Sequence, residues 1–264
     1  MSEQRGYIDF AAGDQATHGE ALKRYKDLAA WLERNGSKYG LPARLAELDH
    51  SGRETVVAVY GGDAQVELAS EDLSPPRSLR LPRLRFAVSS SPALKKTTAN
   101  FLALLTDEKK LVSKRPPNPP LRYVETPVFR IESDFIAQTG DITRRDGSGG
   151  ESIYGGSFND EKEGLKIAFQ KGTLAMANSG KNCERSQLGC LQYSAVGLTP
   201  VPFFVTLTDD PSKLKKLTGK YVAFAQVDLL DADSLECLRQ LDALADGRGG
   251  TVKPVWIDEC GLEQ

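Results

Sequence analysis

The most informative segment of the chain reads Val128-Phe-Arg-Ile-Glu-Ser-Asp-Phe-Ile-Ala-Gln-Thr-Gly-Asp-Ile-Thr-Arg-Arg-Asp-Gly-Ser-Gly-Gly-Glu-Ser-Ile-Tyr-Gly155. Two short apolar runs, 128–131 and 135–137, precede turns rich in glycine, which is typical of short β-strands. Similar apolar runs follow at 166–169, 173–176, 203–207, 222–227 and 252–257. Many short strands with few helices between them indicate a β-barrel or a β-sandwich rather than a βαβ fold.

Two further strands and two helices are predicted outside this segment. Residues 7–11 and 84–88 alternate apolar and polar side chains, as half-buried strands do. Residues 93–105 carry good helix formers after a serine-rich start, and 234–244 form the clear helix later in the chain. These elements predict a mainly β chain.

The composition argues against several functional classes. The 264 residues carry 34 Lys and Arg against 36 Asp and Glu, and a net charge of −2 does not suit non-specific nucleic-acid binding. No apolar run reaches the ~18–20 residues that span a bilayer. Because no secretory signal is visible after Met1, we expect a cytoplasmic protein without membrane contact. Nothing in the pattern suggests an obligate interface, so we expect a monomer.

Metal and cofactor chemistry finds little support. The only two histidines are His18 and His50, which excludes a zinc site or triad that takes its histidine from the carboxy-terminal two-thirds. Cys183 and Cys190 alone offer too few ligands for tetrahedral zinc. The glycine-rich run 146–156 lacks the Gly-Lys-Ser/Thr of a P-loop, so nucleotide binding is a weak interpretation. We expect neither a metal nor a cofactor.

The segment quoted first resembles the cyclophilin-type peptidyl-prolyl isomerases. The family's Phe-His-Arg-x-x-x-x-Phe-x-x-Gln-x-Gly-Asp is similar to residues 128–141, and its Thr-Arg-x-x-Gly-x-Gly-Gly-x-Ser-Ile-Tyr-Gly to 143–155. Further blocks in the family's order lie at 158–161, 172–182, 203–207, 217–224 and 257–261. With the first strand and first helix included, the resemblance covers residues 6–14 and 84–261.

This resemblance implies a closed eight-stranded antiparallel β-barrel capped by two α-helices. We expect one cyclophilin-like domain over residues 1–264, with the barrel built from 5–14 and 84–264. Residues 15–83 are then an inserted helical subdomain, which either packs on the barrel or serves a partner. Helical spacing of Leu28, Trp31 and Leu32 favours packing on the barrel, whereas residues 54–60 are rich in strand formers.

The resemblance assigns the chemistry to Arg130. Rotation about an Xaa-Pro bond meets a barrier of ~18–20 kcal/mol, because the nitrogen lone pair is delocalised into the carbonyl. A permanently charged guanidinium can donate to the prolyl nitrogen more strongly as this resonance is lost, without exchanging a proton. Lowering the barrier by about 7 kcal/mol would accelerate the rotation roughly 10⁵-fold.

The other site residues follow from the same family positions. An apolar hollow for the proline ring is expected from Phe135, Ile136, Phe204 and Leu217. Gln138 matches the residue that bonds the substrate carbonyl and steadies the arginine. The remaining substrate-binding positions are Ala177 and Asn178 on a strand edge, Gln187 in the cleft, and Tyr221, whose hydroxyl replaces a common histidine.

Two departures from the family pattern concern binding. Lys216 stands where many members have a tryptophan that contacts cyclosporin, which predicts weakened affinity for this drug with turnover retained. Residues 188–202 are inserted between Gln187 and Phe203, where the family's Ser-Gln runs directly into Phe-Phe. This insertion could overhang the cleft and change which residues flank the proline.

Two functions remain open from the sequence. The first is a cofactor-free peptidyl-prolyl cis-trans isomerase that acts on proline-containing peptides or proteins and assists folding as a chaperone. The second is a non-catalytic peptide-binding or scaffold module that uses the two insertions as its partner surface. The presence of Arg130 together with Phe135, Gln138 and Phe204 favours the first.

Overall fold

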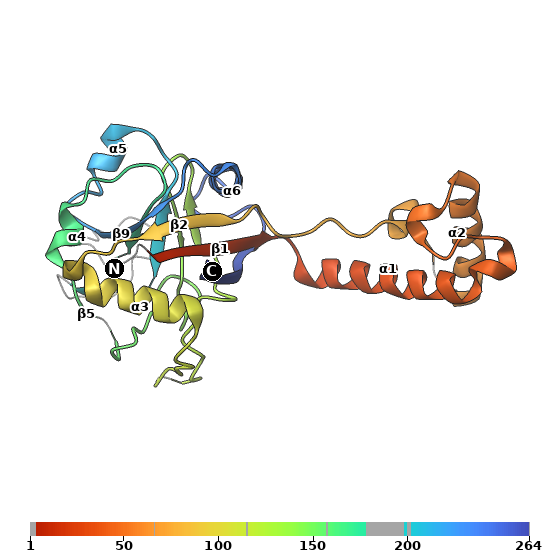
Figure 1. The fold of residues 1–264 in the computed structure, drawn as a ribbon, viewed down its shortest axis with the longest axis horizontal. Helices are drawn as coiled ribbons and strands as arrows, with labels where there is room; N and C mark the ends of the chain where they lie inside the picture. Colours follow the sequence, from red (N-terminus) through yellow and green to blue (C-terminus); the bar gives the residue numbers. More distant parts are fainter. Residues whose placement is uncertain are drawn as a thin grey trace. The chain divides into compact units, whose positions relative to one another are not determined.

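The computed structural model describes residues 4–65, 67–114, 116–156, 158–177, 198–199 and 202–263 (Figure 1). The chain divides into two compact units. The β unit comprises Met1–Ala12 and Arg80–Gln264, and the helical unit comprises Gly13–Leu79.

One antiparallel sheet dominates the β unit. Among the described residues it has eight strands in the order β10-β1-β2-β9-β6-β8-β4-β3. Their bounds are β1 Gln4–Ala12, β2 Leu84–Val88, β3 Arg130–Glu132, β4 Ile136–Thr139, β6 Thr173–Met176, β8 Phe203–Thr206, β9 Val222–Val227 and β10 Val255–Leu262. A separate pair joins β5 (Phe158–Asn159) to β7 (Leu198–Thr199). The prediction of a mainly β, eight-stranded antiparallel fold is confirmed in this form.

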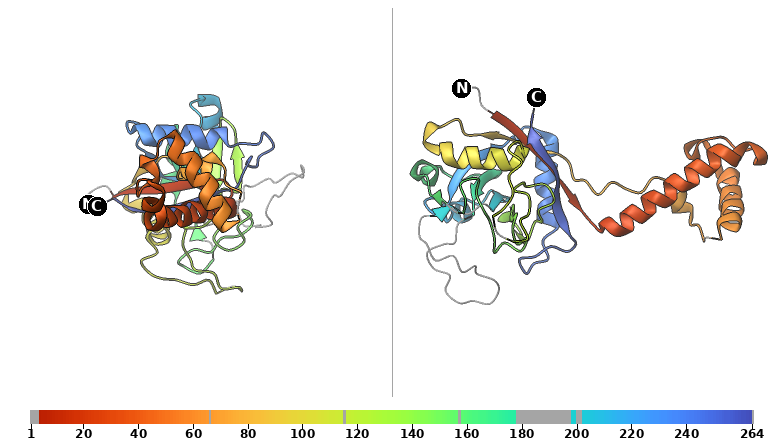
Figure 2. Two further views of the ribbon diagram at one scale, coloured as in Figure 1. Left: turned by 90° about the vertical axis from the view of Figure 1, so that its right-hand side faces the viewer. Right: turned by 90° about the horizontal axis from the view of Figure 1, so that it is seen from below.

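The sheet curls around a core that two helices complete. Helix α3 (Lys95–Thr106) packs against β10, and α6 (Ala232–Ala243) packs against β2, β3 and β4 (Figures 1 and 2). Phe101 of α3 is fully buried and contacts Phe203 and Phe224, with ring centroids 5.3 and 4.6 Å apart. Two short helices, α4 (Lys162–Lys166) and α5 (Pro211–Lys215), lie in connections between strands.

Backbone hydrogen bonds connect the two ends of the strand order. Glu125 N–H donates to Ile257 O and Val128 N–H to Val255 O, both at 2.8 Å, while Ile257 N–H donates to Thr126 O at 3.0 Å. The segment just before β3 is therefore bonded to β10, the strand at the opposite end of the sheet order.

The helical unit has a core of its own. Helix α1 (Gln15–Asn35) is capped by the Asp14 carboxylate, and α2 (His50–Ala64) by the Asp49 carboxylate. The 3₁₀ turns Gly36–Tyr39, Leu45–Glu47 and Ser70–Leu73 complete the unit. The buried side chains that form the core are Leu28, Leu32, Leu45, Leu48, Val56 and Leu73.

Two expectations for this unit are wrong. Leu28 and Leu32 are fully buried in the unit's own core instead of packing on the barrel, and Trp31 packs against that core, with its ring beside Tyr39 and Tyr60. Residues 54–60 form part of α2 rather than a strand. Strand preference is weak and context-dependent, and here the cap at Asp49 and the burial of Val56 outweigh it.

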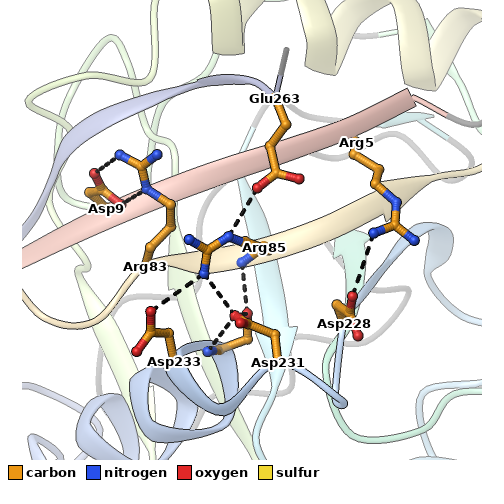
Figure 3. Close-up of polar contacts among 9 residues, drawn as sticks. Arg5, Asp9, Arg83, Arg85, Asp228, Asp231, Asp233 and Glu263 are labelled. Carbon is orange, nitrogen blue, oxygen red and sulfur yellow. Dashed lines mark hydrogen bonds and ion pairs between the residues drawn. The ribbon is translucent and has the colours of Figure 1, made fainter.

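Ion pairs hold the chain where it leaves and re-enters the β unit (Figure 3). Leu81 N–H donates to Phe10 O at 2.8 Å, so the returning segment runs beside β1. The buried Asp9 carboxylate receives two bonds from Arg83 at 2.8 and 2.7 Å. Arg85 bonds Asp231 at 3.0 Å, which connects β2 to the start of α6. Such bidentate and partly buried pairs are stronger than fully exposed ones.

We predict that the helical unit can be excised. Ala11 and Arg80 form an antiparallel bridge, so a short Gly-Ser linker in place of residues 13–79 can connect the two ends. The shortened chain should unfold cooperatively, with an unfolding free energy within about 1 kcal/mol of the β unit in the full chain. Chemical denaturation followed by circular dichroism measures this. A shortened chain that fails to fold would contradict the division into an independent β unit and an insertion.

Candidate functional site

Five strands place one row of side chains on the same face of the sheet. Arg130 on β3 lies opposite Gln138 on β4, and Gln138 lies opposite Phe204 on β8. Phe204 in turn lies opposite Ala175 on β6, which pairs with Ala223 on β9. Directly opposed residues share a face of an antiparallel sheet, so the register alone orients this row.

Arg130 is held at its guanidinium and is half exposed. Its Nη1 donates to Gln138 Oε1 at 3.0 Å, and its Nη2 donates to Glu132 Oε1. The side chain is 47% exposed. A guanidinium carries further N–H donors, and none of these has a partner in the part of the chain that the structure describes. Arg130 is thus oriented by two neighbours and still able to donate to a bound molecule.

An apolar cluster surrounds Phe204 on this face. The Phe169 ring stacks on Phe204 with centroids 6.1 Å apart, and Tyr221 meets it edge-on at 5.1 Å. We refer to the following residues as the Phe204 cluster: Phe135, Ile136, Phe169, Ala175, Ala177, Phe204, Leu214, Leu217, Tyr221 and Ala223. Phe135 and Tyr221 are partly buried at its margin, where an apolar ligand could contact them.

The turn between β3 and β4 is tied to α5 beside the cluster. Lys213 Nζ donates to Asp134 Oδ2 at 2.6 Å and to Asp134 O at 2.9 Å. The hydrogen bond from Lys213 holds the pKa of the Asp134 carboxyl below its usual range. Phe135 O accepts from Leu207 N–H at 2.8 Å. These bonds hold the segments that contribute Phe135 and Leu214 to the Phe204 cluster.

The glycine-rich loop is organised by a buried carboxylate. Asp141 is fully buried, and among the described residues it accepts from five backbone N–H groups at 2.8–3.2 Å, those of Thr143, Arg144, Asp146, Gly147 and Gly149. Gly147 has φ +86°, and a Cβ there would lie 2.5 Å from the Phe129 ring. The N–H groups that could cradle a phosphate are therefore occupied by the protein's own anion, which agrees with the weak nucleotide interpretation.

The structure brings most of the predicted site residues together. Gln138 bonds Arg130, and the Phe204 cluster contains the six predicted apolar or aromatic residues Phe135, Ile136, Ala177, Phe204, Leu217 and Tyr221. Asn178 and Gln187 lie outside the described residues, as do Cys183, Cys190 and most of the 188–202 insertion. On either side of that gap, Ala177 N–H donates to Pro202 O at 2.9 Å.

Sequence reasoning missed five residues at this site. Glu132 bonds the arginine, and four members of the Phe204 cluster were not predicted: Phe169, Ala175, Leu214 and Ala223. Glu132 follows the predicted run 128–131 directly, and had that strand been extended by one residue, the spacing of two from Arg130 would have placed both side chains on one face. Phe169 lay in a predicted apolar run, but nothing local indicated which face of the sheet it would cover.

In the ranges that the structure describes, no three His, Cys, Asp or Glu side chains are grouped so as to hold a metal ion. Of the helices described, none combines the length and apolar character needed to cross a membrane.

The chain belongs to the cyclophilin-type peptidyl-prolyl cis-trans isomerase family. The model of the family described as "Cyclophilin type peptidyl-prolyl cis-trans isomerase/CLD" matches residues 91–262, which include every strand of the site row. The resemblance seen in the sequence is thereby confirmed.

Two curated relatives are similar over this region. The E3 SUMO-protein ligase RanBP2 of Pan troglodytes and that of Homo sapiens are each 32% identical to the chain over 166 residues. The aligned part covers 63% of this chain and 4% of each relative. The chain therefore spans only a small fraction of the length of these relatives.

We predict that Asp141→Asn strongly destabilises the β unit. The amide replaces one acceptor oxygen by an NH₂ group that faces backbone donors, and the charge that strengthened all five bonds is lost. The unfolding free energy should fall by about 3 kcal/mol. Asp209→Asn, at an exposed ion pair with Lys171, is the control and should change it by less than about 1 kcal/mol. Equal stability of the two variants in urea denaturation would contradict the role given to Asp141.

Proposed function

We propose that this chain is a peptidyl-prolyl cis-trans isomerase that acts on proline-containing peptides and proteins without a cofactor. The observation that carries the proposal is the site row: the Arg130 guanidinium is held by Gln138, has donors without a partner among the described residues, and shares a face with the Phe204 cluster. Membership of the cyclophilin-type family supports the same reaction.

The reaction requires stabilisation of a twisted amide and no covalent step. In the planar ground state the prolyl nitrogen is a poor acceptor, because its lone pair is shared with the carbonyl. As the bond rotates, the lone pair localises and accepts from a positioned N–H of Arg130. Since this hydrogen bond is stronger in the transition state than in the ground state, it accelerates the rotation. A fixed guanidinium does this without proton transfer.

The remaining residues would bind the substrate. Phe135, Ile136, Phe204 and Leu217 would receive the proline ring, which is apolar and fits an aromatic and aliphatic surface. Gln138 would orient Arg130 and contact the substrate carbonyl. Ala177, Asn178, Gln187 and Tyr221 are assigned to the flanking peptide from the family positions.

A non-catalytic peptide-binding module is the second candidate. The ion pair between Arg130 and Glu132 favours it, because a carboxylate compensates part of the charge that the reaction would use. In this case the Phe204 cluster would bind proline-containing peptides without accelerating their rotation.

Several finer properties complete the proposal. The hydrogen bonds between residues 125–128 and β10 support closure of the curled sheet into a barrel. An isomerase of this kind would assist folding as a chaperone, since prolyl isomerisation limits the folding of many chains. A monomeric state and a cytoplasmic location stay predictions from the sequence.

We predict that Arg130→Ala lowers kcat/KM for an Ala-Pro peptide by about 10²–10³-fold, the effect of removing one preorganised donor. Exchange NMR measures the rate, and peptide-induced shifts in the same spectra measure binding, which should persist through the Phe204 cluster. Arg239→Ala, which breaks an exposed pair with Glu236 on α6, is the matched control and should leave the rate unchanged. Exchange in wild type no faster than the uncatalysed reaction would leave only the peptide-binding module, and equal catalysed rates for wild type and Arg130→Ala would contradict the role given to Arg130.

We predict weak inhibition by cyclosporin, which Lys216→Trp should strengthen. Lys216 follows α5 and precedes Leu217 of the Phe204 cluster, so an indole there would add apolar contact area beside the cluster. The affinity for the drug should rise at least about tenfold, or 1.4 kcal/mol. Lys215→Trp, at the neighbouring exposed position, controls for a general increase in hydrophobicity. Nanomolar inhibition of the wild type would refute the prediction.

A further inference from the structure

Glu132 places a carboxylate inside the candidate site. It lies on β3 two residues beyond Arg130, on the same face, and directly opposite Ile136 of the Phe204 cluster. Sheet geometry separates Arg130 and Glu132 by about 7 Å along the strand. A peptide side chain that reaches over Ile136 would therefore meet the carboxylate before the guanidinium.

The carboxylate remains accessible to a second cation. Within the described residues its only bond is to Arg130, through one of its two oxygens, and its side chain is 35% exposed. Lys213 of α5 is bonded to Asp134, in the turn that follows β3. Among the described residues the second oxygen of Glu132 therefore has no hydrogen-bond partner, and the side chain keeps a third of its surface exposed.

From this geometry we infer that Glu132 determines charge specificity: the site selects proline-containing substrates with a cationic residue beside the proline and disfavours those with an acidic one. The inference rests on the proposed function, because it concerns substrates of the same site. An exposed carboxylate attracts a nearby ammonium or guanidinium group and repels a carboxylate.

The test compares Ala-Xaa-Pro-Ala and Ala-Ala-Pro-Xaa peptides in which Xaa is Lys, Ala or Glu. For each peptide, exchange NMR gives kcat/KM, and chemical-shift titration gives Kd. At the flank that lies over Ile136, kcat/KM should be about threefold higher for the Lys peptide than for the Ala peptide, and about threefold higher for Ala than for Glu. A factor of this size corresponds to the energy of an exposed ion pair. In 1 M NaCl, where the screening length is about 3 Å, the preference should largely disappear.

Glu132→Gln decides the cause of any preference. It keeps the length of the side chain and an acceptor for Arg130, and the readout is the ratio of the Lys and Glu peptides within each variant rather than the absolute rate. In Glu132→Gln this discrimination between Lys and Glu should be lost. Glu236→Gln breaks a comparable pair with Arg239 outside the site and should keep the discrimination.

The outcomes separate this inference from the proposed function. The inference would be overturned if the Ala peptides turn over but neither flank shows discrimination between Lys and Glu. It would also be overturned if the discrimination survives in Glu132→Gln. Both results would leave the proposed isomerase function standing. Absence of turnover in wild type would overturn the proposed isomerase function. The ratio of Kd values for the Lys and Glu peptides, measured in wild type and Glu132→Gln, would still decide the role of Glu132.

Discussion

The alternation of side chains along the strands is the constraint on which both the core and the candidate site depend. On β8, Phe203 points into the main core whereas Phe204 lies on the opposite face, and on β4 the same division separates Ala137 from Gln138. A shift of one residue in the pairing of β4 with β8 would turn Gln138 towards the core and leave Arg130 without its neutral partner. Because the register that buries the core also builds the site, selection for a stable fold keeps the site row in place.

The β unit holds charged groups in two contrasting ways. Arg130 lies on β3, at the end of the strand order, where half of its side chain stays in water and one amide and one carboxylate orient it. Asp141 is fully buried, and its charge is tolerable because backbone N–H groups surround both oxygens. Among the described residues the first arrangement leaves guanidinium donors without a partner, whereas in the second five backbone donors are bonded to the carboxylate. This difference explains why the arginine is a functional candidate and the buried carboxylate is a structural one.

Much of the β unit could be predicted because its signals are local. Alternation located β1 and β2, and a motif of matched spacing identified Arg130, Phe135 and Gln138. The missed features depend on contacts between distant segments. Phe169 joins the site only because the turn before β6 folds back onto Phe204, and residues 54–60 are helical because a distant core buries Val56. Neither contact produces a hydrophobic periodicity in its own segment of the sequence.

The helical unit is inserted between two strands that carry no residue of the site row. The chain leaves the sheet after β1 and returns before β2, and β1 pairs only with β10 and β2 among the described strands. The site row runs over β3, β4, β8, β6 and β9, none of which pairs with β1. Bonds from Arg83 to Asp9 fix the returning chain without involving any residue of that row. A binding surface on the helical unit would raise the effective concentration of a client at the site, because both belong to the same chain.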